Sequence, residues 1–316
     1  METRLLAPPE AITAAVDLLA AGELVALPTE TVYGLGACAL NPLACAKVFE
    51  AKERPLSDPL IVHLPDPGWL EQLARPNLLA RTLAERFWPG PLTMVLPRTE
   101  RVPDIVTDGQ DTVAVRMSAH PVFRQIASGL GQPIAAPSAN RFGRISPTTP
   151  GHVRTELGGR IPLIVDGGPC AHGIESTIVS VREQGVVILR HGPITQEQLE
   201  ELAPVLSGKT GEVTPGSMKS HYAPRTPLDL LPSGSLTEVT DPSRAGLLAF
   251  SKPKEGFGRV EILSASGDPR EAATHLYGAM RRLDEAGLER IVAESLPETG
   301  LGAAIMERLR KAAARD

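Results

Sequence analysis

Short apolar segments alternate with amphipathic helical patterns through the first two hundred residues of this chain. Residues 11–21 place Ile12, Ala15 and Leu19 on one helical face, and residues 24–27 form an apolar strand directly afterwards. Each apolar strand needs a sheet neighbour, and each amphipathic helix needs a sheet face to cover. The alternation therefore predicts an α/β domain.

Helix and strand signals recur at short spacing along the same stretch. A cap residue followed by proline, Asn41-Pro42, predicts a helix that runs to about Lys52. Thr195 and Gln198 form a capping box for a helix that ends near Leu206. A further helix is expected at residues 78–88, and further strands at residues 60–64, 92–96, 112–116, 134–136, 163–166, 177–181 and 186–190.

The composition and the hydrophobic pattern of the sequence change after Leu206. Residues 207–227 are rich in Ser, Gly, Thr, Lys and Pro and show no hydrophobic period, so they are interpreted as a linker. Residues 228–316 form a second, smaller α/β unit. Its strands are expected at 228–231, 247–250 and 291–294, and its helices at 269–286 and 302–313.

Composition limits the class of protein. The 316 residues suit two domains, and 32 basic against 37 acidic side chains give a formal net charge of −5. That acidity weighs against holding nucleic acid by bulk charge. No apolar run reaches the roughly 20 residues that cross a bilayer, and no signal-peptide pattern is present. Cys38, Cys45 and Cys170 lack zinc or disulfide spacing, so a reducing cytoplasm is expected.

Polar residues and glycines gather where the predicted strands and helices end. Residues 28–36 follow a strand and are typical either of a ligand site or of a simple glycine turn. Lys52 and Arg54 suit phosphate oxygens, although cations at a helix C-terminus are often only solvated. A lone histidine such as His63 is more often structural than catalytic. Arg116 ends an apolar strand and needs an anionic partner, either a protein carboxylate or a ligand.

Later strand ends repeat this pattern. Small residues before Ser138 and Asn140 would let a ligand approach the backbone, and Ser146, Ser176 and Arg190 also lie near strand ends. The chain has no phosphate loop, dinucleotide fingerprint, zinc helix or serine elbow. From spacing alone, the sequence indicates an α/β enzyme or binding protein for a small anion.

Six motifs stand in one order along the chain. They are PTETVYGLG at 28–36, KERP at 52–55, PLIVH at 59–63, WPGPLT at 88–93, VAVR at 113–116 and APSAN at 136–140. Together they resemble the YrdC-like family of threonylcarbamoyl-AMP synthases. Residues 215–224, which contain HYAP, and the C-terminal unit resemble the long, two-domain form of that enzyme.

The resemblance implies a fold and a reaction. It implies a twisted mixed sheet with surrounding helices over residues 1–206, a linker at 207–227 acting as an active-site lid, and a Rossmann-like domain at 228–316. Such nucleotidyltransferases join L-threonine, bicarbonate or CO₂, and ATP into threonylcarbamoyl-AMP and release diphosphate. A separate transferase then modifies tRNAs that read codons beginning with A. Stable tRNA binding and a membrane association are not expected.

The resemblance also assigns residues. Lys52 and Arg54 would be catalytic. Threonine would be held by Thr31, His63, Arg116, Ala136 and Ser176, and ATP by Arg54, Asp58, Thr112, Ser138, Asn140, Ser146, Arg190 and Tyr222. The family commonly has asparagine in place of Asp58, and a carboxylate there would repel phosphate unless Mg²⁺ lies between them. Mg²⁺ is expected to arrive with ATP, with no metal site built from protein side chains.

Two rival functions remain open at this point. A double-stranded RNA or tRNA-binding module would use a concave basic surface, but the net charge of −5 disfavours it. Carbamoyl-group handling in metallo-centre maturation would be expected beside zinc-finger-like cysteines, which this chain lacks.

Overall fold

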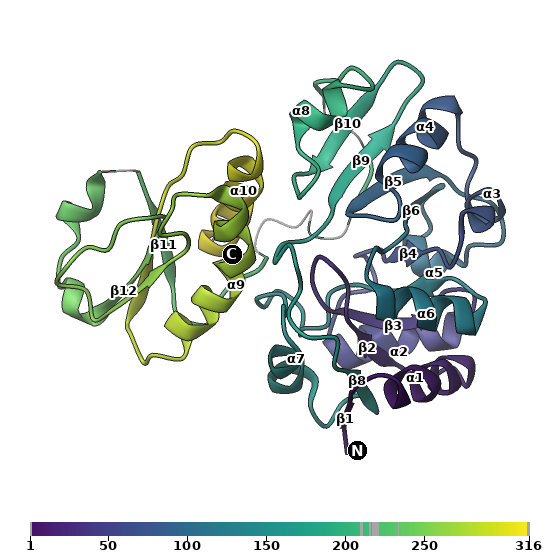
Figure 1. Ribbon diagram of the computed structural model, residues 1–316, viewed down its shortest axis with the longest axis horizontal. Helices are drawn as coiled ribbons and strands as arrows, with labels where there is room; N and C mark the ends of the chain where they lie inside the picture. Colours follow the sequence, from purple (N-terminus) through teal and green to yellow (C-terminus); the bar gives the residue numbers. More distant parts are fainter. Residues whose placement is uncertain (1, 209–210, 215, 217–220, 233, 315–316) are drawn as a thin grey trace. The chain divides into compact units, whose positions relative to one another are not determined.

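The computed structural model describes residues 2–208, 211–214, 216, 221–232 and 234–314 (Figure 1). The chain forms two compact units. The first comprises Met1–Phe142, Pro147–Cys170 and Glu175–Ser217, and the second comprises Gly143–Ser146, Ala171–Ile174 and Met218–Asp316. Residues 209–210, 215 and 217–220 of the expected linker lie outside the described residues.

A ten-stranded mixed sheet forms the first unit, in the order β1-β8-β2-β3-β7-β4-β6-β5-β9-β10. Its strands are β1 (Arg4–Leu6), β2 (Val25–Leu27), β3 (Gly34–Cys38), β4 (Ile61–His63), β5 (Leu92–Pro97), β6 (Thr112–Arg116), β7 (Ile134–Ala135), β8 (Leu163–Val165), β9 (Thr177–Val181) and β10 (Val186–Arg190). β4 and β6 are parallel, whereas β5 and β6 are antiparallel. The expected twisted mixed sheet is therefore confirmed.

Eight α-helices are described in this unit. They are α1 (Glu10–Ala20), α2 (Pro42–Lys52), α3 (Leu70–Leu73), α4 (Leu78–Phe87), α5 (Asp104–Thr107), α6 (Pro121–Leu130), α7 (Pro150–Leu157) and α8 (Gln196–Glu200), with a 3-10 turn η1 at Pro67–Trp69. The Asn41 side chain caps α2, and Thr195 and Gln198 form the capping box of α8, both as predicted. α8 ends six residues earlier than expected, because Pro204 has no N–H for the Glu200 carbonyl.

The sequence did not reveal β1, β3, α6 or α7. β3 begins inside the glycine motif that was interpreted only as a loop. A Cβ at Gly36 would lie 2.8 Å from Leu27 Cδ1, so glycine lets β3 pair closely with β2. The motif therefore continues directly from a turn into the sheet.

Helices cover both faces of part of this sheet. α1 and α6 lie side by side on one face (Figure 1), where Leu19, Phe123 and Ile126 are buried in one apolar cluster with Val25 and Leu27. The opposite face carries the larger cluster, which includes residues of α2 and α4. Beyond β7, the face that α1 and α6 cover continues as a small apolar cluster of Ile61, Val95, Ala114 and Ile178.

A four-stranded parallel sheet forms the second unit, in the order β11-β14-β12-β13. Its elements are β11 (Leu228–Leu231), η2 (Ser235–Glu238), η3 (Pro242–Arg244), β12 (Ala245–Ala249), β13 (Arg259–Ile262), α9 (Pro269–Asp284), β14 (Arg290–Glu294) and α10 (Leu301–Ala313). The Rossmann-like arrangement is confirmed, and β13 is a strand that the sequence analysis missed.

Two short segments from earlier in the chain belong to this unit. Gly173 has φ +71°, and a Cβ there would lie 2.5 Å from the Thr274 Cα of α9, so only glycine allows this approach. Arg281 of α9 donates to the carbonyl of Ile145. In the part of the chain that the structure describes, no helix is long and apolar enough to span a bilayer.

Candidate active site

One face of β4, β6, β5 and β9 carries several of the residues that the sequence singled out. Side chains alternate along a strand, so Thr112, Ala114 and Arg116 of β6 share one face. In the register, Ile61 pairs with Ala114 and His63 with Arg116. The result is an apolar floor with polar groups at both ends of the strands.

Arg116 is held in a buried hydrogen-bonded cluster at the end of β6. Its Nη2 lies 2.6 Å from Glu30 Oε1, its Nη1 donates to Thr31 Oγ1 at 3.0 Å, and its Nε donates to the Gly90 carbonyl at 3.2 Å. Ser118 Oγ donates to the second oxygen of Glu30 at 2.5 Å. The anionic partner that a buried strand-end arginine needs is thus supplied by the chain itself.

The electrostatics of this cluster fix two charge states. Burial opposes ionisation of Glu30, but the Arg116 charge and hydrogen bonds from Ser118 and Arg116 outweigh it and lower the pKa of Glu30 to about 2. Burial, assisted by the Arg116 charge, lowers the pKa of His63 to about 3. At neutral pH, Glu30 is therefore a carboxylate and His63 a neutral ring, packed 4.8 Å from Phe123 between ring centroids.

Ser176 and Arg190 meet next to this cluster. Arg190 Nη2 donates to Ser176 Oγ and Arg190 Nε donates to the Ser176 carbonyl, each at 3.0 Å. Thr93 Oγ1 lies 2.8 Å from Ser176 Oγ. The segment that carries Gly90 also links the two groups, because the Thr177 N–H donates to the Pro91 carbonyl.

Lys52 meets Ser138 and Asn140 at the end of α2. Its Nζ donates to the backbone carbonyls of both residues, and its side chain is 1% exposed. Burial, together with the nearby Arg54 charge, holds the pKa of Lys52 well below its ordinary value. Lys52 therefore shapes the loop that contains Ser138 and Asn140.

Arg54 and Asp58 form a buried ion pair beside Lys52. Arg54 Nη2 lies 2.9 Å from Asp58 Oδ2, while Arg54 Nε donates to the Asp58 carbonyl at 3.0 Å. Burial raises the pKa of Asp58, and the charges of Arg54, Lys52 and Arg190 counteract part of that rise. Three basic side chains thus act on one carboxylate, at the position where the family that the sequence resembles commonly has asparagine.

Strand geometry sets the spacing of these groups. Asp58 precedes β4 and His63 ends it, while Thr112 begins β6 and Arg116 ends it. Four residue steps of about 3.3 Å separate the two ends of β6 by about 13 Å. The face therefore has an Arg116 end and an Asp58 end.

The other predicted residues lie as follows. Ala136 is buried, and its Cβ would lie 3.1 Å from a Cβ at Gly34, so both residues must be small. Thr112 is half-buried at the Asp58 end. Ser146 and Tyr222 belong to the second unit, where the Tyr222 ring stacks on Tyr277 with centroids 5.9 Å apart. Their contact with ATP stays a prediction.

Glu30, Ser118 and Thr93 belong to the site but were not expected from the sequence. A signal for Glu30 existed, because a strand-end arginine was expected to need a carboxylate and Glu30 stands in the quoted 28–36 motif. Nothing in the sequence pairs Ser118 with Glu30, because the two residues are 88 positions apart and only the sheet brings them together.

The linker contacts the first unit near the start of β6. The Gln110 side chain donates to the Val213 carbonyl at 3.1 Å and accepts from the Val213 N–H at 2.9 Å. Glu212 accepts from Ser180 and Arg182, each at 3.0 Å. Ser180 of β9 pairs with Val95 of β5, so its side chain lies on the same face of the sheet as Val95 and Ala114.

Among the described residues, no group of three or more His, Cys, Asp or Glu side chains could hold a metal ion. Asp58 Oδ1 is buried and receives no hydrogen bond from the described residues, and carboxylate oxygen is a ligand that Mg²⁺ accepts. The residues fit a cation held mainly by a phosphate ligand and touched by one carboxylate.

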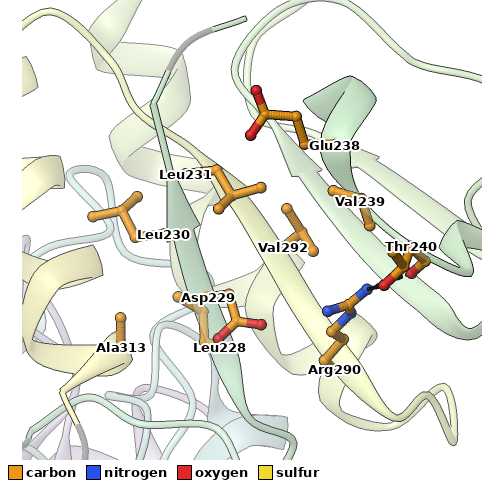
Figure 2. Close-up of a pocket in the computed structure, with 10 residues that line it drawn as sticks. All are labelled: Leu228, Asp229, Leu230, Leu231, Glu238, Val239, Thr240, Arg290, Val292 and Ala313. Atoms are coloured by element: carbon orange, nitrogen blue, oxygen red, sulfur yellow. Dashed lines mark hydrogen bonds between the residues drawn. The ribbon is translucent and has the colours of Figure 1, made fainter. Parts of the chain in front are cut away.

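A separate pocket of about 620 Å³ lies in the second unit along β11 and β14 (Figure 2). Figure 2 shows Arg290 reaching toward Thr240, to whose carbonyl it donates, with Asp229 and Glu238 also lining the pocket. None of the predicted site residues lines it.

The first unit is a mixed α/β domain whose fold recurs in a solved structure. Escherichia coli YciO shares the fold with a TM-score of 0.53 at 20% identity, covering 61% of this chain and 96% of that one. The family model described as "Telomere recombination", for Sua5, YciO and YrdC proteins, matches residues 17–192. The model described as "Threonylcarbamoyl-AMP synthase, C-terminal domain" matches residues 194–314.

Full-length relatives narrow the class. A Bacillus subtilis threonylcarbamoyl-AMP synthase is 42% identical, covering 96% of this chain and 92% of its own length, and a Pyrococcus abyssi one is 40% identical, covering 95% and 93%. The crystal structure of P. abyssi Sua5 complexed with L-threonine matches with a TM-score of 0.89 at 37% identity, covering 99% of this chain and 98% of that one. The chain belongs to the threonylcarbamoyl-AMP synthase family, and the resemblance noted in the sequence is confirmed.

Proposed function

We propose that this chain joins L-threonine, bicarbonate or CO₂, and ATP into L-threonylcarbamoyladenylate, with release of diphosphate. The proposal is carried by one observation: a chain of this family has buried arginines near both ends of one sheet face, with an apolar floor between them. The product would pass to a separate transferase that modifies tRNA, in the cytoplasm. The chain would not need to hold that tRNA.

Threonine is proposed to bind at the Arg116 end. Arg116 directs three of its five N–H donors at Glu30, Thr31 and Gly90, which leaves two for a carboxylate. A planar guanidinium suits a carboxylate in a two-bond arrangement. The hydroxyl of Ser176 and the neutral ring of His63 would contact the rest of the amino acid, and the small Ala136 would leave room for it.

ATP is proposed to bind at the Asp58 end. Arg54 would oppose the phosphate charge, and Arg190 lies close enough to influence Asp58. Lys52 keeps the loop of Ser138 and Asn140 in place, and a nearby triphosphate would favour its charged form. Thr112 would add a hydroxyl at the same end.

The chemistry then needs positioning and charge neutralisation. The ammonium group of threonine first loses a proton to solvent, and the neutral amine attacks CO₂ and releases a second proton to give an N-carboxylate. That carboxylate attacks the α-phosphorus of ATP as diphosphate leaves. Mg²⁺ accompanying ATP would supply further neutralisation of the phosphate oxygens. The residues at the two ends of β6, about 13 Å apart, would orient the two substrates so that the N-carboxylate and the α-phosphate meet over the apolar floor.

The reaction can be tested with purified protein, ATP, Mg²⁺, bicarbonate and radiolabelled threonine. We expect threonine-dependent release of diphosphate together with labelled threonylcarbamoyl-AMP. Omitting bicarbonate should abolish both products. ATP cleavage that is independent of threonine would refute the proposal, as would binding of tRNA without any adenylate product.

A further inference from the structure

Glu30 is a buried carboxylate for which neither the sequence analysis nor the proposed chemistry has a role. It is 7% exposed, and its two oxygens face Arg116 and Ser118. A structural carboxylate would only need to satisfy Arg116. However, Arg116 is also the residue proposed to receive the substrate carboxylate, so Glu30 adjoins the substrate position.

Glu30 changes the net charge that a ligand meets at Arg116. Arg116 contributes +1 and Glu30 contributes −1, while the remaining partners Thr31, Ser118 and His63 are neutral at pH 7. A simple anion that approaches this buried, net-neutral ion pair loses its hydration without gaining a net opposite charge from the pair. An amino-acid zwitterion is itself net-neutral, and its ammonium group gains from a nearby carboxylate.

We propose that Glu30 is a specificity-determining positioning residue, which orients Arg116 and neutralises its charge so that the site accepts the threonine zwitterion and rejects anions that lack an amino group. Such anions include the bicarbonate and diphosphate that the reaction itself uses. The inference rests on the proposed role of Arg116 in threonine binding. Glu30 does not serve as the base that deprotonates the amine, because its pKa of about 2 makes the carboxylate too weak a base to take a proton from an ammonium group.

The test uses 3-hydroxybutanoate, which keeps the carboxylate and hydroxyl of threonine but lacks the amino group. The readouts are the KM for threonine and the Ki of 3-hydroxybutanoate against it, from diphosphate release at saturating ATP. The wild-type protein should prefer threonine by about 100-fold or more, since a buried charge partner is worth that order. Equal affinities in the wild-type protein would overturn the proposal without any variant.

The variant Glu30→Gln keeps the shape of the side chain and removes its charge. It should reduce the preference for threonine by about tenfold or more, while the KM for ATP changes less than about twofold. Glu30→Asp keeps the charge, so it should retain most of the preference even where the threonine KM rises. Glu85→Gln, an exposed position on α4, is the matched control and should behave as wild type.

The outcomes separate this proposal from the role of Arg116. The preference for threonine could be unchanged in Glu30→Gln while Arg116→Ala still raises the KM for threonine more than the KM for ATP. That result would refute the role of Glu30 alone. Equal loss of threonine and ATP affinity in Arg116→Ala would refute the role of Arg116. If Glu30→Gln does not fold, the wild-type ratio and Glu30→Asp decide the question, because loss of the preference in Glu30→Asp would also overturn the proposal.

Discussion

Arg54 Nη2 lies 2.9 Å from Asp58 Oδ2, in an ion pair whose side chains are only 3% and 2% exposed. A buried guanidinium that is already paired with a carboxylate offers less net charge to an incoming phosphate. The pair therefore sets how strongly the Asp58 end of the sheet face attracts ATP.

Replacing Asp58 by asparagine should strengthen ATP binding. The change removes the negative charge beside Arg54 and retains the backbone carbonyl that Arg54 Nε contacts. We expect the KM for ATP to fall by about threefold to tenfold, since one partly compensated charge is removed. The measurement is initial-rate kinetics at saturating threonine, with the exposed Asp17→Asn as control. A rise in the KM for ATP would instead indicate that Asp58 contacts a cation bound with the nucleotide.

Replacing Arg116 by alanine should affect threonine selectively. Two donors proposed for the threonine carboxylate are lost, and Glu30 is left as a buried charge without its cation. The KM for threonine should rise by about tenfold or more, while the KM for ATP should change less than about twofold. Thermal unfolding of the same sample shows how much of the loss of activity comes from instability.

Acid should destabilise the first unit through His63. The pKa of His63 is about 3 in the folded protein and about 6.5 in the unfolded chain. Between these values the unfolded chain binds a proton at His63 and the folded chain does not. The free energy of unfolding should therefore fall as pH falls, by about 2 to 3 kcal/mol between pH 7 and pH 4.5. Glu30 adds a loss only below about pH 4.5, its ordinary value.

The variant His63→Gln should flatten that dependence between pH 6.5 and 4.5. Urea unfolding can be followed by tryptophan fluorescence, because both tryptophans, Trp69 and Trp88, lie in the first unit. The exposed His275→Gln is the control. Equal pH dependence in wild type and His63→Gln would show that His63 is protonated normally in the folded protein.

The linker contact at Gln110 should be measurable by hydrogen exchange. The variant Gln110→Ala removes both hydrogen bonds to the Val213 backbone, each worth about 1 kcal/mol. Exchange of the Val213 amide should accelerate by about fivefold or more, and turnover should fall if the linker acts as a lid. Gln184→Ala, at an exposed position, should leave both quantities unchanged. An unaltered exchange rate would mean that Gln110 does not hold the linker.

Local sequence signals predicted much of the fold. The Asn41 cap and the Thr195 capping box each depend on residues within a few positions, and both formed as expected. β3 was missed because its Gly34 and Gly36 resemble a turn locally, and only close pairing with β2 makes them a strand. The short α7 was missed as well, since its apolar period is weak.

The contacts of the candidate site also fall into two groups: those that local spacing predicts and those that only the tertiary structure shows. The pairing of Arg54 with Asp58 spans four residues, so local spacing alone brings the two groups near each other. The pairing of Arg116 with Glu30 spans 86 positions and was foreseen only as a need for some anion. The contact of Ser118 with Glu30 and that of Thr93 with Ser176 left no sequence signal, because each joins separate strands or loops.

The sequence by itself determined the α/β class, the order of its motifs and the family to which the chain belongs. These properties follow from hydrophobic periodicity and from residue types at fixed local spacing. Only the tertiary structure decided which carboxylate forms an ion pair with each buried arginine. Strand order and register, with His63 level with Arg116 and Ile61 level with Ala114, place distant residues on one face. On that face the Arg116 charge and the hydrogen bonds from Ser118 and Arg116 keep Glu30 ionised against the effect of burial, whereas burial keeps His63 neutral.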